Sequence, residues 1–125
     1  MKIILTNQES ENIFFDALCN GLGYVCGYGF DIEFDSKDYA KAKSTTSNGS
    51  FEEVLMAILK NGGSLTLVDV ENDGAETATI SLQDVHERVS SVESETLLMA
   101  YNEDGDADTA DAVLQTVFFK EITFG

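Results

Sequence analysis

The sequence predicts an α+β fold: a single compact domain spanning residues 1–125, with a mixed or antiparallel sheet of about five strands and four or five short helices. A length of 125 residues is typical of one domain. The 43% hydrophobic content, with eight Phe and four Tyr, is enough for a buried core and differs from that of acidic disordered chains. Segments with helix and strand periodicity follow one another in mixed order, which favours α+β.

The first half predicts two strands and two helices. Thr6 and Glu9 stand at capping-box spacing and open a helix over 7–20, which Asn20-Gly21 is expected to end. A short strand at 2–6 precedes it and a glycine-rich turn at 21–29 follows it. The remaining expected elements are a strand at 30–35, a helix from Asp35 or Ser36 through Lys43, and a loop at 44–49.

The helix expected at 51–60 has the clearest pattern. Ser50 and Glu53 form a capping box, and apolar residues recur at i, i+3, i+4, i+7 and i+8. Strands at 64–71 and 76–82 flank Asp73-Gly74, a pair typical of hairpins.

The last third predicts short helices and a closing strand. Ser81 with Asp84, and Ser90 with Glu93, are expected to cap two short helices. An acidic segment at 103–108 leads into a helix near 108–114, and an apolar strand is expected at 116–124.

Acidic charge dominates the composition. The chain holds 23 Asp and Glu against seven Lys and Arg, a formal net charge of -16. So few basic residues argue against direct binding to nucleic acid or to an anionic membrane. Cations and basic protein surfaces are the expected partners, although high charge alone also keeps a small protein soluble.

No apolar run has the length of a signal-peptide core or a membrane span, so we expect a cytoplasmic protein. Cys19 and Cys26 are too few for a disulfide scaffold, and reduced thiols are expected, with a Cys19–Cys26 bridge as the alternative.

No metal or cofactor is predicted. Asp104, Asp106 and Asp108 alternate as in a calcium loop, but Thr109 and Gln115 stand where that loop needs Gly and Glu. Cys19, Cys26 and His86 are only three ligands for zinc, which usually takes four. The glycines of 21–29 follow a helix and precede a strand, the reverse of a phosphate-binding loop.

Two acidic clusters are the candidate partner-binding residues. The run 30–35 alternates apolar and acidic residues, so a strand there places its carboxylates on one face, roughly 6.7 Å apart. Such a row can imitate a nucleic-acid backbone in a Lys- and Arg-lined groove. The alternative is a solvated face that discourages edge aggregation. The candidates are Asp31, Glu33, Asp35 and Asp38, then Glu103, Asp104, Asp106, Asp108 and Asp111.

Three stretches in the C-terminal half carry a resemblance: 84–89 (DVHERV), 108–111 (DTAD) and 113–119 (VLQTVFF). Over about residues 50 to 125 the chain resembles small acidic proteins carried by bacteriophages and conjugative elements. The resemblance brings no catalytic residues with it. It implies a mobile-element context, in which inhibitors of host defence are common and several imitate nucleic acid.

These observations predict a non-enzymatic acidic inhibitor that binds the basic surface of a host nucleic-acid-binding complex, of the anti-CRISPR or anti-restriction type. One alternative is a phage structural or assembly protein that forms homo-oligomers through the edge of the 116–124 strand. Another is a small ligand-binding domain or enzyme around Tyr24, Cys26, Tyr28 and His86.

Overall fold

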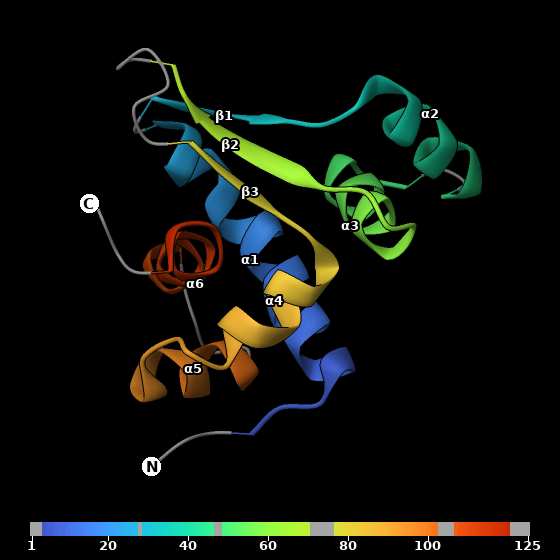
Figure 1. The fold of residues 1–125 in the computed structure, drawn as a ribbon. Coiled ribbons are helices and arrows are strands. Elements are labelled where there is room, and N and C mark those ends of the chain that lie inside the picture. The colour runs from blue at the N-terminus through green and yellow to red at the C-terminus, as the bar shows by residue number, and fades with distance from the viewer. Residues whose placement is uncertain (1–3, 28, 47–48, 71–76, 103–106, 121–125) are drawn as a thin grey trace.

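The computed structural model describes residues 4–27, 29–46, 49–70, 77–102 and 107–120. These residues form an α+β fold that is mostly helical, with six helices and a three-stranded antiparallel sheet (Figure 1). The elements in chain order are α1 (Asn7–Gly27), β1 (Phe30–Glu33), α2 (Ser36–Thr45), α3 (Phe51–Lys60), β2 (Leu65–Asp69), β3 (Ala78–Ile80), α4 (Leu82–Val89), α5 (Ser94–Tyr101) and α6 (Ala107–Phe119).

The sheet has the strand order β1-β2-β3, so β2 lies between two outer strands. Phe30 pairs with Asp69 across β1 and β2, and Leu65 pairs with Ile80 across β2 and β3. One face of the sheet is packed against α1, α3 and α6 (Figure 1). Leu67 is fully buried in β2, whereas the side chains before and after it are only partly buried, as expected for a sheet with one core-facing side.

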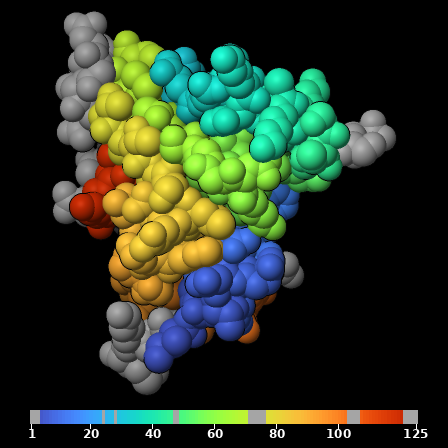
Figure 2. All heavy atoms as spheres, turned by 45° about the vertical axis from the view of Figure 1, so that its right-hand side comes forward, coloured from blue at the N-terminus to red at the C-terminus, as the bar shows by residue number. Residues whose placement is uncertain are grey.

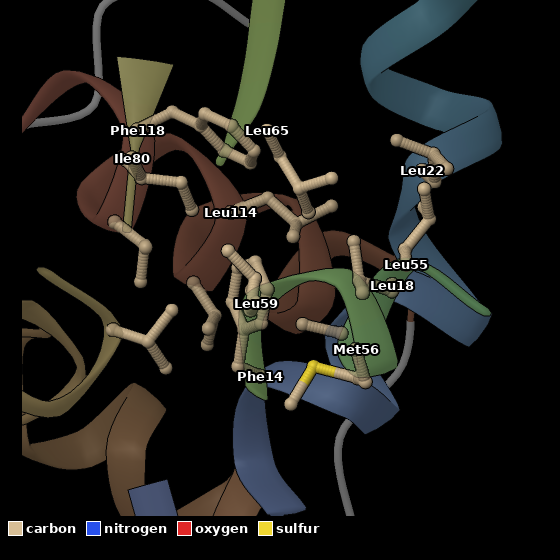
Figure 3. Close-up of a cluster of buried hydrophobic side chains, with 14 of the residues drawn as sticks. Phe14, Leu18, Leu22, Leu55, Met56, Leu59, Leu65, Ile80, Leu114 and Phe118 are labelled. Atoms are coloured by element: carbon tan, nitrogen blue, oxygen red, sulfur yellow. The ribbon is translucent and has the colours of Figure 1, made fainter. Parts of the chain in front are cut away.

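The buried apolar side chains form a single cluster. Figure 3 shows them converging from α1, α3, the sheet and α6. The residues labelled there are Phe14, Leu18, Leu22, Leu55, Met56, Leu59, Leu65, Ile80, Leu114 and Phe118. Phe14 of α1 also meets Phe118 of α6 as a tilted ring pair, with centroids 6.2 Å apart.

Helices α1 and α6 approach each other closely. Gly21 of α1 lies against Ala110 of α6, and a Cβ placed on Gly21 would stand 2.7 Å from the Ala110 Cβ. Real Cβ atoms do not approach so closely, so glycine at this position sets the spacing of the two helices.

Helix α1 is longer than predicted. The glycine-rich stretch was expected to be a turn, but α1 continues to Gly27. Leu22 and Val25 extend the buried stripe of Leu18 at spacings of four and three residues, so packing overrides the low helix propensity of glycine. The turn comes later, at Gly29, whose φ of +95° favours glycine.

The predicted strand at 116–124 is wrong for residues 116–119, which complete α6; 121–125 lie outside the described residues. Ala110, Val113, Leu114 and Val117 are all buried and follow helical spacing through this segment. The β-branched and aromatic residues of 116–119 favour a strand, but the segment is helical because its buried residues follow helical spacing.

The predicted strand at 2–6 is not confirmed either. Residues 4–6 have no regular structure, and Ile4 is 90% exposed. Together with 116–119 this accounts for the difference between five predicted strands and the three observed in the described residues.

Most of the predicted helix starts are confirmed. The Thr6 N–H donates to Glu9 Oε1 at 2.9 Å, and the Glu9 N–H donates to Thr6 Oγ1 at 3.1 Å. Ser50 caps α3, and Asp84 accepts from the Ser81 N–H at 2.8 Å at the start of α4. The cap of α5 is Glu93 itself rather than Ser90.

Helix α2 is attached at the periphery. Ala42 is its one buried residue, and it packs mainly against α3. An aromatic cluster fastens it: Phe34 stacks on Tyr39 with centroids 4.9 Å apart, and both rings contact Phe51 at the start of α3.

The α1–α6 spacing generates a paired prediction. Gly21→Ala should destabilise the fold by about 1–3 kcal/mol, because the added methyl group overpacks the contact with Ala110. Gly23→Ala, two residues along the same helix, meets nothing within 4 Å and should stabilise by about 0.5–1 kcal/mol. Urea unfolding of both variants measures the difference. Equal effects of the two substitutions would contradict the close contact.

Candidate functional site

The alternating row is present on β1 for Asp31 and Glu33, but the strand predicted to run to residue 35 ends at Glu33, which leaves Asp35 at the start of α2. Phe30 is buried, whereas Asp31 and Glu33 are exposed on the opposite side of the strand. Their cross-strand partners are Val68 and Thr66 of β2. The two carboxylates therefore lie on the face of the sheet away from α1, α3 and α6.

The next two candidates in the row belong to α2. Asp35 is exposed and caps this helix, because Oδ1 accepts the backbone N–H groups of Lys37 and Asp38 at 2.8 and 3.1 Å. The carboxylate is held in a fixed orientation, and it stabilises the positive end of the helix dipole. Asp38 is half-buried and lies close to Gly63.

Lysines near the row do not neutralise it. Lys37, Lys41 and Lys43 are exposed on α2. In the described part of the chain, no ion pair within 4.0 Å joins any of them to the carboxylates of Asp31, Glu33 or Asp35. The charge of the row therefore faces solvent.

Of the second predicted cluster, only Asp108 and Asp111 lie in the described residues, and these two do not share one surface. Glu103, Asp104 and Asp106 lie outside the described residues. Asp108 is exposed in the first turn of α6, whereas Asp111 is buried, with only 8% of its surface exposed. Helical spacing explains the split, because Asp111 falls on the face of α6 that packs against α1 at Gly21.

Asp111 is an unusual buried acid. Its Oδ2 accepts a hydrogen bond from Gln115 Nε2 at 3.0 Å, while Oδ1 is buried without a partner. Burial raises the pKa of Asp111 above its ordinary value, and the Gln115 hydrogen bond opposes that shift only in part. Because Asp111 is buried on the face of α6 that packs against α1, it does not belong to the exposed acidic surface.

His86 and Cys26, the described side chains among those suggested for an enzyme, lie far apart. The His86 Nε2 atom lies 2.8 Å from Glu11 Oε2, near the start of α1. Cys26 lies 15 residues further along that helix, which corresponds to about 22 Å. Tyr28 and the side chain of Tyr24 are outside the described residues.

Glu11 links three helices. It contacts His86 of α4, and its Oε1 lies 3.6 Å from the Lys60 Nζ of α3. Arg88 of α4 in turn donates to the Val117 carbonyl near the end of α6 at 2.9 Å and pairs with Asp84 at 3.3 Å. These polar contacts fasten α4 to the helical core.

The described residues hold no group of three or more His, Cys, Asp and Glu side chains that could bind a metal ion. Cys19 and Cys26 are free thiols, so they do not form the alternative disulfide. None of the helices in the described ranges combines the length and apolar character that a membrane span requires.

A second acidic surface, around α1, was missed by the sequence reading. Two hollows flank this helix and share Asn12 as a lining residue. The first hollow, about 310 Å³, lies between α1 and α3 and is lined by Glu11, Asn12, Phe15, Thr46, Glu53, Met56, Ala57 and Lys60. The second, about 230 Å³, lies between α1 and α5 and is lined by Glu9, Asn12, Ile13, Asp16, Ala100 and Tyr101.

The acidic residues of this surface affect the pKa of Cys19. Burial raises the pKa of Cys19, and the carboxylates of Glu52, Asp16 and Glu53 raise it further. These acids come from two helices that are distant in sequence. Spacing along α1 signals part of the arrangement, since Glu9, Asn12 and Asp16 share one face, but the contribution of α3 is visible only in three dimensions.

Comparisons with known proteins yield no match: no family model, curated protein or solved structure is similar to the chain.

The buried acid leads to a stability prediction. A raised pKa in the folded state means that the folded protein loses stability as pH rises from the unfolded pKa of Asp111 through its folded pKa. Asp111→Asn removes this penalty, so it should stabilise the protein by about 1 kcal/mol at neutral pH. The gain should vanish at acidic pH, where the wild-type acid is protonated.

Thermal unfolding between pH 3 and 8 measures this effect. Glu95→Gln, on the exposed surface of α5, removes the same charge and is the control. If both substitutions change stability equally at every pH, the gain comes from lower net charge rather than from the buried site.

Proposed function

We propose that this protein is a non-enzymatic inhibitor that binds the basic, nucleic-acid-binding surface of a host defence complex. It would be an anti-CRISPR or anti-restriction protein carried by a mobile element. The exposed carboxylates of Asp31, Glu33 and Asp35 would take the place of phosphates in a Lys- and Arg-lined groove.

The observation that carries the proposal is the row at β1. Asp31 and Glu33 project from one side of a paired strand, and Asp35 follows at a helix cap that fixes its orientation. Carboxylates on an ordered backbone can form charge-assisted hydrogen bonds at a lower entropic cost than carboxylates on a flexible tail. The formal charge of -16 adds long-range attraction to a basic partner.

A capture experiment tests the proposal directly. The folded protein is used to capture partners from host lysate at low and moderate salt, and mass spectrometry identifies them. The proposal expects one DNA- or RNA-binding complex, released as salt rises and displaced by its own nucleic acid. Capture that is indifferent to both salt and nucleic acid would contradict it.

Charge reversal in the row is the sharper prediction. Asp31→Lys with Glu33→Lys should weaken binding to the captured complex by at least about tenfold, because attraction becomes repulsion at the contact. Surface plasmon resonance measures the affinity. The control is Glu87→Lys with Glu95→Lys, an equal change of net charge on α4 and α5.

The comparison separates local from global charge. If the two double variants lose affinity to the same extent, only net charge matters and the row has no particular role. If neither loses affinity, the electrostatic basis of the proposal fails.

A further inference from the structure

We propose that the two hollows flanking α1 form a docking surface for an extended basic polypeptide segment that crosses the helix at Asn12. The inference rests on the proposed function for its class of partner, a basic protein. It concerns a different surface, because the row at β1 and the N-terminal half of α1 belong to separate parts of the fold (Figure 1).

The first hollow suits the stem of a long basic side chain. Phe15 of α1 and Met56 and Ala57 of α3 supply apolar surface, against which the methylene groups of Arg or Lys pack. Glu53 supplies a carboxylate at the N-terminal end of α3. Figure 2 shows α3 directly beside α1 on the face that contains these helices.

Glu11 and Lys60 also line the first hollow. Their carboxylate and ammonium groups are 3.6 Å apart, and Glu11 meets His86 as well. The charge of Lys60 is therefore balanced within the protein. Glu53, seven residues before Lys60 on α3, is the acid at the far end of the hollow, about 10 Å away.

The second hollow repeats this chemistry on the other side of Asn12. Ile13 of α1 and Ala100 of α5 are apolar, and Glu9 and Asp16 are acidic. Tyr101, half exposed, presents a ring suited to a guanidinium or ammonium group, and it hydrogen-bonds Glu9.

Charge complementarity selects the occupant. Glu9, Asp16 and Glu53 line the hollows, and Lys60 is the basic residue among the lining residues. Beside burial, the carboxylates of Glu52, Asp16 and Glu53 raise the pKa of Cys19, as expected where acidic side chains lie close together. An extended segment with alternating basic residues reaches both hollows by crossing a single helix, and it carries more positive charges than a short polyamine.

The probe is a capped ten-residue peptide of alternating Arg and Ala, titrated at low salt. Calorimetry gives the affinity, and amide chemical shifts locate the contact. We expect shifts concentrated in the first half of α1, in α3 and at the end of α5. Spermidine, titrated in parallel, should bind at least about tenfold more weakly, since it carries fewer positive charges than the peptide and makes fewer simultaneous contacts.

Three variants separate the hollows from diffuse charge. Asp16→Asn with Glu53→Gln should weaken peptide binding about five- to tenfold, since two charge contacts, one with a half-buried and one with an exposed carboxylate, are lost. Gln at position 53 keeps a side-chain oxygen that can accept from the Ser50 hydroxyl, as Glu53 does at 3.4 Å. Ala57→Leu fills the first hollow without changing charge and should weaken binding to a similar extent. The matched control, Glu87→Gln with Glu95→Gln on the exposed surfaces of α4 and α5, should change it less than about twofold.

Each outcome is decisive. Equal weakening by the two charge-removing pairs, unchanged binding by Ala57→Leu, or equal affinity for spermidine would overturn the docking surface. Amide spectra verify folding of each variant, and Asn12→Trp replaces Ala57→Leu as the steric test if the latter unfolds. Peptide binding at α1 together with host capture that is insensitive to charge reversal at β1 would instead contradict the proposed function alone.

Discussion

The approach of α1 to α6 is the constraint on which the fold depends. A Cβ at position 21 would stand 2.7 Å from Ala110, so the spacing of the two helices is possible only with glycine there. That spacing brings Phe14 to Phe118 and lets α6 lie almost fully buried between α1, the sheet and α5. The sheet is then free to present its other face to solvent. The exposed row at β1 is thus a consequence of packing on the opposite side.

Local signals in the sequence located most elements, because helix caps and turn residues act within a few positions. Thr6 with Glu9, Ser50 with Glu53 and Ser81 with Asp84 each start a helix where the spacing predicts it. Two assignments failed because tertiary packing overrode local preference. Glycines in α1 suggested a turn, and the aromatic end of α6 suggested a strand, yet both segments supply a continuous buried stripe to the core.

The candidate residues show the same division. Alternation along β1 is a local property, and it correctly placed Asp31 and Glu33 on an exposed side. Asp111 was grouped with surface acids by its neighbours in sequence, but the face of α6 that it occupies is decided by contact with α1. The hollows beside Asn12 combine residues from three helices, so no pattern within one segment contains them.

The peripheral attachment of α2 divides the acidic row into two parts of different stability. Asp31 and Glu33 belong to a strand paired with β2, whereas Asp35 caps α2 and Asp38 lies within it, a helix that buries only Ala42 and is fastened by three aromatic rings. So little buried surface means that α2 opens at a lower free energy than the core. Binding of a partner that contacts the whole row includes the entropic cost of ordering α2. A partner that contacts only β1 binds a strand that is already ordered. Selectivity between such partners would then depend on local unfolding as well as on charge.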